Sequence, residues 1–219
     1  MPKDQSRHIV QRLPKRADYE RTTINTIIDE ALICHVGFCD AGQPVVIPTI
    51  HARIGNQILL HGLKGGRLLK HVNAGHDVCI TVTLLDGLVL ARSAFHHSMN
   101  YRSAVIFGKG REVVDATDKM AAMQRFVEHL TPGRWEHVRQ PNAKEFKVTS
   151  VVAIDMEDAS AKVRTGPVSD EDEDYALPIW AGVVPLELMA SPPVADAKLD
   201  PDTRTPEHVT GYQPATRKK

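Results

Sequence analysis

Hydrophobic and polar residues alternate with a period of two through much of the chain. The alternation runs through "ALICHVGFCD", "VVIPTIHARI", "QILLHG", "DVCITVTLLDG" and "LVLARSAF". This spacing is typical of strands that bury one face. Two further strands are predicted over "SAVIFGKGREVV" and, as one long element, over "TSVVAIDMEDASAKVRTG". Gly55-Asn56 falls between two of these strands and suits a two-residue hairpin turn.

Helical spacing of apolar residues appears in three places. Residues 18–31 predict a helix that Asp18 caps, and residues 115–130 predict an amphipathic helix. A shorter helix is expected after Gly65-Gly66, ending near residues 73–75. Six or seven closely spaced strands with a few helices favour a mainly β, α+β fold built on an antiparallel barrel over a βαβ array.

The ends of the chain differ in composition from its middle. Residues 1–17 are basic and contain Pro14, which predicts an N-terminal arm. Residues 18–190 carry the periodic segments and predict one domain. Residues 191–219 are rich in Pro, Asp and Lys and predict a flexible C-terminal tail.

Charge and cysteine content narrow the possible partners. The formal net charge is zero and the sequence pI is about 7.2, which argues against a nucleic-acid partner. No apolar run approaches the ~20 residues of a membrane helix, so no membrane partner is expected. The three cysteines, Cys34, Cys39 and Cys79, lie among apolar residues without CxxC spacing. Reduced thiols and a cytoplasmic location are therefore expected.

The segment "HGLKGGRLLKHV" combines a strand end with a glycine loop and a helix start. Lys64 and Arg67 add positive charge where backbone N–H groups are free. Such a junction suits a phosphate group, although a surface turn with ordinary cations gives the same pattern.

A second polar segment, "AFHHSMNYRS", places hydrogen-bonding side chains at the start of a predicted strand. His97, Asn100, Tyr101, Arg102 and Ser103 suit the carbonyls and nitrogens of a ring system. Adjacent strand residues point to opposite faces, so His96 and His97 do not share a metal, and no metal site is predicted. A phosphate at one end and a polar heterocycle along strand edges describe flavin mononucleotide (FMN).

Three stretches resemble the flavin-binding split-barrel family typified by pyridoxamine 5'-phosphate oxidase, near the branch of the nitroimidazole-resistance reductases. They are "GQPVVIPTIHARIGNQILLHGLKGGRLLKHV", "SAFHHSMNYRSAVIFGKGREV" and "PIWAGVVPL", and the resemblance spans roughly residues 10–190. It implies a six-stranded antiparallel split barrel and a homodimer with FMN in a groove at the subunit interface.

The resemblance also implies roles for individual residues. Backbone groups of Ile47, Pro48, Thr49 and Ile50 would contact the isoalloxazine ring. His61 and Gly62 lie at the end of the next strand, before Lys64, Gly66 and Arg67, which fall where the family grips the phosphate. The remaining expected contacts come from His97, Asn100, Tyr101, Arg102 and Ser103, and from Trp180, which approaches from the partner chain.

Two departures separate this sequence from the oxidases. Ile47 stands where they have an arginine, and their substrate-binding Arg and His motif is not visible after Trp180. We therefore expect a reductase or oxidase that passes electrons from a nicotinamide cofactor through FMN to a small molecule. Imidazole exchanges a proton near neutral pH, so His61 and His97 are candidate proton donors. The alternative is a flavin- or haem-binding protein without turnover; some relatives bind haem or a deazaflavin.

Overall fold

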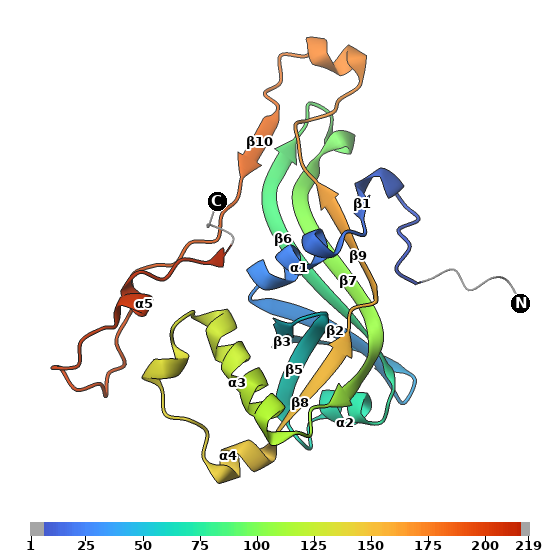
Figure 1. The fold of residues 1–219 in the computed structure, drawn as a ribbon. Helices are drawn as coiled ribbons and strands as arrows, with labels where there is room; N and C mark the ends of the chain where they lie inside the picture. The colour runs from blue at the N-terminus through green and yellow to red at the C-terminus, as the bar shows by residue number, and fades with distance from the viewer. Residues whose placement is uncertain (1–6, 216–219) are drawn as a thin grey trace, which may run out of the picture.

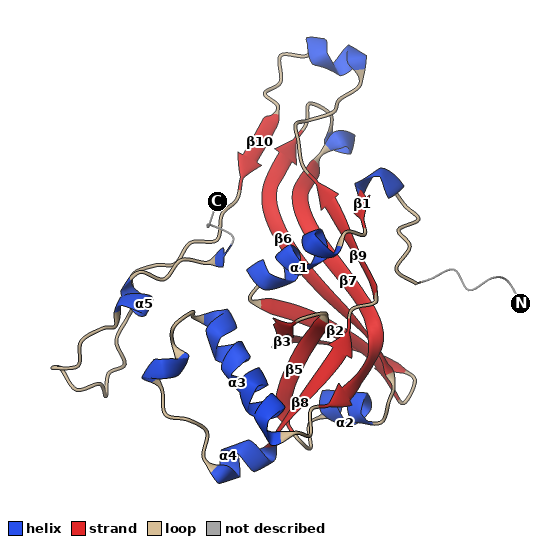
Figure 2. Cartoon of the chain, viewed as in Figure 1, coloured by secondary structure: helices blue, strands red, loops and turns tan. Residues whose placement is uncertain are grey.

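The computed structural model describes residues 7–215, which form a mostly antiparallel β structure with short helices around it (Figures 1 and 2). The strands are β1 Ala17–Asp18, β2 Ile33–Asp40, β3 Gln43–Ile50, β4 Ala52–Ile54, β5 Gln57–Leu63, β6 Asp77–Leu90, β7 Ser98–Glu112, β8 Thr149–Asp155, β9 Asp158–Arg164 and β10 Gly182–Pro185. The α-helices are α1 Arg21–Glu30, α2 Arg67–Asn73, α3 Ala116–Leu130, α4 Ala143–Val148 and α5 Glu207–Thr210. Single turns of 3-10 helix are η1 Pro14–Arg16, η2 Ala94–His96, η3 Trp135–His137 and η4 Asp172–Ala176.

The main sheet follows the order β3-β2-β6-β7-β8-β5-β4, and every pair in it is antiparallel. β9 and β10 add to β7 and β6 beside this path. β3 and β5 approach each other, but no ladder joins them among the described residues, so the sheet curls without closing. The predicted mainly β, α+β fold and its split barrel are therefore confirmed.

The two faces of β5 pack against different parts of the molecule. Ile58 and Leu60 belong to the main core, which also holds apolar residues of α1 and α2. Leu59 belongs to a smaller cluster beneath α3 that includes Phe126. Because strand side chains alternate between faces, residues at odd positions of β5 face α3 and those at even positions face α2. This alternation decides where the functional candidates at the end of β5 point.

Several predicted strands are divided differently in the structure. The two strands expected over residues 77–95 are one strand, β6, because Asp86 forms a bulge between Leu85 and Gly87 instead of a turn. The single strand expected over 149–166 is the hairpin β8–β9. β3 and β4 are separate because His51 interrupts the strand expected over 45–54.

The described segments before α1 and after β10 flank the main sheet. The predicted N-terminal arm includes η1 and β1, and β1 pairs with β9; residues 1–6 of that arm lie outside the described residues. In the predicted tail, residues 191–215 are mostly exposed, α5 places His208 against His137, and residues 216–219 lie outside the described range. The three-part division of the chain stays a prediction. No helix within residues 7–215 has the length and apolar character needed to span a membrane.

Candidate functional site

The split between β3 and β5 brings together the first group of predicted site residues. Ile47, Pro48, Thr49 and Ile50 lie on β3, which pairs with β2 on one side only. The outer edge of β3 therefore presents backbone N–H and C=O groups that no described strand uses. Pro48 fits this position because an edge strand tolerates the missing N–H of proline.

The predicted phosphate residues follow β5 directly. A turn closed by the Gly66 N–H, which donates to the Leu63 carbonyl at 2.8 Å, leads from β5 into α2. A Cβ at Gly66 would stand 3.1 Å from that carbonyl, so the tight turn favours glycine. The turn and α2 form one wall of a cavity of about 580 Å³. The cavity is lined by Cys39, Asp40, Ala41, Gly65, Arg67, Lys70, His71, Ala74 and His76.

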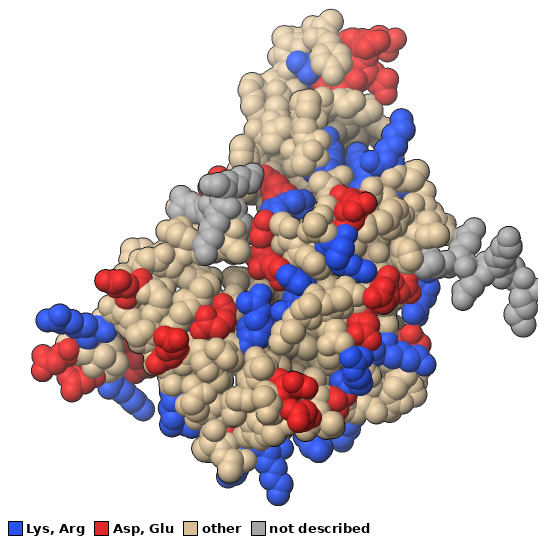
Figure 3. Space-filling model, viewed as in Figure 1, with Lys and Arg blue, Asp and Glu red and all other residues tan. Residues whose placement is uncertain are grey.

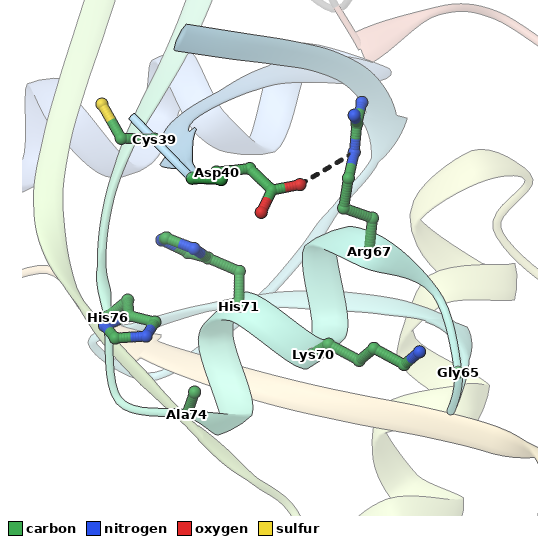
Figure 4. Close-up of a pocket in the computed structure, with 9 residues that line it drawn as sticks. Cys39, Asp40, Gly65, Arg67, Lys70, His71, Ala74 and His76 are labelled. Atoms are coloured by element: carbon green, nitrogen blue, oxygen red, sulfur yellow. Dashed lines mark ion pairs between the residues drawn. The ribbon is translucent and has the colours of Figure 1, made fainter. Parts of the chain in front are cut away.

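One arginine and one lysine, Arg67 and Lys70, give this cavity its positive charge. Arg67 and His71 are four residues apart on α2 and project toward Asp40, whereas Lys70 extends toward Gly65 (Figure 4). The Arg67 Nε atom is 3.9 Å from an Asp40 oxygen, and the Arg67 side chain is 57% exposed. A long, exposed ion pair contributes little to stability. Arg67 can therefore leave Asp40 and bind an anion with little loss of folding free energy.

Lys64 does not line this cavity. Its Nζ atom is 3.9 Å from a Glu112 oxygen at the end of β7, and its side chain is 68% exposed. The structure therefore brings Arg67 together with Lys70, His71 and Asp40, which were not predicted as site residues. The spacing Arg67, Lys70, His71 was a usable signal, because residues i, i+3 and i+4 share one face of a helix.

The second predicted group lies at the far end of the β6–β7 hairpin. His97 is exposed, and its Nδ1 donates to the Ser93 carbonyl at 3.0 Å. Asn100 donates to the Gly166 carbonyl at 3.1 Å and accepts a hydrogen bond from Arg164. Tyr101 is half-buried between β6 and β9.

Arg102 and Ser103 make contacts inside the protein. Arg102 donates to Asp86 at 2.9 and 3.0 Å and to Glu30 at 2.5 Å. These hydrogen bonds, the larger effect coming from Asp86, raise the pKa of Arg102 above its usual range. Ser103 Oγ donates to the Lys162 carbonyl at 3.4 Å. The bulge at Asp86 thus positions a carboxylate for Arg102 and ties the hairpin to the end of α1.

Trp180 lies just before β10 and is 68% exposed. Its indole ring covers Gly182, where a Cβ would come within 3.0 Å of the ring. Glycine two residues after the tryptophan therefore permits this ring position, which accounts physically for the Trp-x-Gly element. Exposed Phe95 and Met99 lie at the same end of the hairpin, which thus presents apolar side chains to its surroundings.

The two groups of predicted residues do not meet within one chain. His71 of α2 donates to the Asp77 carbonyl at the start of β6, whereas Asn100 pairs with Gly87, ten residues further along that strand. At ~3.3 Å per residue, this separation is about 33 Å along the strand. Figure 1 shows α2 at one end of the long hairpin and β10 at the other.

His61 faces away from the α2 cavity. At an odd position of β5, its ring packs on Phe126 of α3 with centroids 4.3 Å apart. Gly62, the next residue, faces α2, where Leu69 lies 3.7 Å from the position of a Cβ. Burial lowers the pKa of His61, so the imidazole is held neutral near pH 7.

No group of three or more His, Cys, Asp or Glu side chains within residues 7–215 is arranged to hold a metal ion. Lys, Arg, Asp and Glu side chains are interspersed on the face shown in Figure 3, in keeping with the zero net charge. The expectations of no metal and no nucleic-acid partner stay predictions.

The chain belongs to the family described as pyridoxamine 5'-phosphate oxidase, whose model matches residues 20–163. This match confirms the family predicted from the three sequence stretches. A search of the curated proteins finds no match.

Two solved structures are similar over nearly the whole chain. Flavocytochrome Anf3 from Azotobacter vinelandii is 40% identical, with a TM-score of 0.88, covering 93% of this chain and 95% of its own. An FAD- and haem-binding protein from Mycobacterium smegmatis is 31% identical, with a TM-score of 0.85, covering 90% and 96%.

A candidate 5-nitroimidazole antibiotic resistance protein from Bacteroides thetaiotaomicron shares the fold. Its identity is 24% and its TM-score 0.57, covering 67% of this chain and 86% of its own.

Proposed function

We propose that this protein is a flavin-dependent electron-transfer protein whose flavin phosphate binds beside α2. The observation that carries the proposal is the cavity at the β5–α2 junction, which Arg67 and Lys70 line together with Asp40 and Ala41 at the turn that leads into β3. A phosphate suits the two cations, and the edge of β3 offers backbone donors and acceptors to the ring. Family membership and the two similar flavoproteins support the same cofactor class.

We propose FMN as the flavin, as the sequence predicts. The chemistry that a flavin supplies is reversible uptake and release of one or two electrons. Arg67 and Lys70 would neutralise its phosphate, and Ile47, Pro48, Thr49 and Ile50 would orient the ring through backbone groups. The relative from M. smegmatis is an FAD-binding protein. Acid release of the flavin from purified protein, followed by chromatography, distinguishes FMN from FAD.

We propose that the flavin site is completed by a second copy of the chain. His97, Asn100, Tyr101 and Trp180 lie at the opposite end of the hairpin from Arg67, so a partner subunit is the means by which both groups reach one flavin. The exposed Trp180, Phe95 and Met99 support burial of this end in a homodimer. Sedimentation equilibrium tests this: a dimer is expected, and a monomer that still binds flavin would contradict it.

We propose that electrons enter from a reduced nicotinamide cofactor and leave to a small acceptor. Mixing the flavin-loaded protein with NADH or NADPH under anaerobic conditions tests this role. Loss of the flavin absorption band, and its return when a quinone or nitro compound is added, is the expected result. A band that persists with both nicotinamides contradicts the reductase and favours a flavin-binding protein without turnover.

A haem is the second cofactor that we propose. A flavocytochrome and an FAD- and haem-binding protein are similar to this chain over at least nine tenths of its length.

We also propose a cytoplasmic location. Cys34, Cys39 and Cys79 are free, and burial raises the pKa of Cys34 to about 12, which keeps that thiol protonated.

A further inference from the structure

A second cavity, of about 320 Å³, lies on the α3 side of β5, between α3 and the segment that leads to α4 (Figure 1). The residues that line it differ from those that line the cavity at α2, so the two are separate sites. An apolar cavity of about 150 Å³ is enough to hold benzene. The second cavity therefore has room for two fused aromatic rings. Its apolar lining consists of Met123, Phe126, Val127, Trp135, Val138 and Pro141.

Aromatic surface in this cavity comes from both β5 and the segment after α3. The rings of His61 and Phe126 pack with centroids 4.3 Å apart, and Trp135 is contributed by η3. The main-chain N–H of Trp135 donates to one oxygen of Glu128 at 2.8 Å, and that of Gly133 donates to the other at 2.7 Å. The carboxylate of Glu128 thus holds the main chain at Trp135, whereas the indole ring is left as part of the cavity lining.

The ionisable groups of the lining carry no net charge near pH 7. They are His61, Arg139 and Glu145 among residues 7–215. Arg139 donates to both oxygens of Glu145, at 2.8 and 2.9 Å, and the two side chains are 68% and 46% exposed. These hydrogen bonds, with a further one from the Asn142 N–H, lower the pKa of Glu145 to about 2, so the ion pair is complete at neutral pH. Burial lowers the pKa of His61, which keeps the imidazole neutral.

This charge balance selects against ionic ligands. A charged molecule that enters an apolar cavity loses hydration, and this loss is offset only if it meets an unpaired ion of opposite sign. Arg139 and Glu145 already satisfy each other at the rim. A neutral aromatic molecule loses little hydration and gains contacts with aromatic side chains.

We propose that this cavity is a binding site for a neutral aromatic molecule of one or two rings, which packs against Phe126 and Trp135. The inference goes beyond the proposed function and does not depend on it, because the flavin phosphate is placed in the cavity at α2.

The test is calorimetric titration of the full-length protein, saturated with FMN, with naphthol and with naphthoate of the same substitution. The two probes share their rings and differ in charge, and bound FMN keeps them out of the flavin site. Naphthol should bind once per chain, and naphthoate should bind at least ~10-fold more weakly. No binding of naphthol at millimolar concentration, or equal binding of both probes, would overturn the proposal. If the protein takes up no flavin, the proposed function fails, but the same titration without FMN still tests this site.

Glu145→Gln tests the part played by the ion pair. Glutamine also serves in a capping box, so the start of α4 at Asn142 should be kept. The variant leaves Arg139 without its carboxylate, so naphthoate should bind at least ~5-fold more tightly than to the wild type. Naphthol affinity should stay within about 2-fold of the wild type, since the rings do not need the pair. An unchanged affinity for naphthoate would contradict the selection by charge.

Trp135→Ala tests the aromatic contact. It should weaken naphthol binding by at least ~5-fold, whereas Trp135→Phe should keep most of the affinity. The main-chain bond from residue 135 to Glu128 does not need the indole, and circular dichroism checks that each variant folds. Trp180→Ala removes the other tryptophan of the chain, which is exposed at the far end of the hairpin, and should bind naphthol as the wild type does. Equal naphthol affinities of Trp135→Ala and Trp180→Ala would overturn the site. If Trp135→Ala does not fold, the naphthoate affinity of Glu145→Gln decides.

Discussion

The imidazole rings of His51 and His129 pack against each other with centroids 5.0 Å apart. The Nε2 atom of His51 donates to the Ile28 carbonyl and that of His129 to the Ala31 carbonyl, both at 2.8 Å. The pair thus ties the end of α1 to α3. His51 is fully buried, and this burial lowers its pKa to about 4, despite the hydrogen bond to Ile28 that acts in the opposite direction.

This pair should make the folded state sensitive to acid. His51 takes up a proton near pH 6.5 in the unfolded chain but only near pH 4 in the folded chain. The folded state therefore loses stability as the pH falls from about 6.5 to about 4. For His51 the full loss is about 3 kcal/mol. Burial also lowers the pKa of His129, whose charged neighbours include Asp29 and Arg125. Protonation of His129 therefore adds to the loss of stability at low pH.

Urea unfolding of the wild type and of His51→Gln at pH 7.5 and pH 5 measures the effect. The fall in unfolding free energy between these pH values should be smaller in His51→Gln. Replacing the exposed His76 by Gln should leave the wild-type dependence unchanged. An equal fall in all three proteins would show that His51 is not responsible.

Arg67→Ala should weaken FMN binding by about 1.5–3 kcal/mol, the typical worth of a charge-assisted hydrogen bond. Quenching of flavin fluorescence on binding gives the dissociation constant. Arg111→Ala is the matched control because it removes an arginine of similar exposure, paired with Asp155 at 2.9 Å away from the cavity. The phosphate position is wrong if Arg67→Ala binds FMN as tightly as Arg111→Ala does.

Gly110→Ala should destabilise the protein and disturb α2. A Cβ at Gly110 would overlap the Cγ1 atom of Val72 in α2, and valine has little rotamer freedom to move away. We expect a loss of roughly 1–3 kcal/mol in unfolding free energy, as for overpacked cores. Gly37→Ala, where the nearest atom is 3.5 Å from the Cβ, is the control. Similar stabilities of the two variants would contradict this close packing.

Arg102→Met should lower the unfolding free energy by roughly 1–3 kcal/mol, because it leaves the partly buried Glu30 and Asp86 unpaired. Arg111→Met removes an exposed ion pair and should change the unfolding free energy by less than about 0.5 kcal/mol. Thermal and urea unfolding provide the comparison. If Arg102→Met loses flavin affinity with unchanged stability, Arg102 serves the cofactor, as the sequence suggested, and the structural interpretation is wrong.

The sequence predicted best where local signals agreed. The "GN" dipeptide between alternating segments marks the β4–β5 hairpin, and Gly55 has the positive φ, +56°, that this turn requires. "GGRLLKHV" likewise predicted α2. The capping box Asn142…Glu145 was available in the sequence as the signal for α4, which was missed.

Contacts between segments that lie far apart along the chain were harder to predict from one sequence. Asp86-Gly87 has the composition of a turn, and only the pairing of β6 with β7 converts it into a bulge. The predicted site residues were treated as one set because nothing local shows that His97 and Arg67 lie at opposite ends of a hairpin. Nor did spacing show that His61 faces α3 whereas Gly62 faces α2, since that depends on α3, which comes more than fifty residues later.

The affinities of the wild-type protein for FMN and for riboflavin, measured side by side, test the central claim most directly. The two ligands share the ring and differ by the phosphate that Arg67 and Lys70 are proposed to hold. We predict that FMN binds at least ~10-fold more tightly, since one charge-assisted contact alone is worth that much. Equal affinities would contradict the placement of a flavin phosphate beside α2.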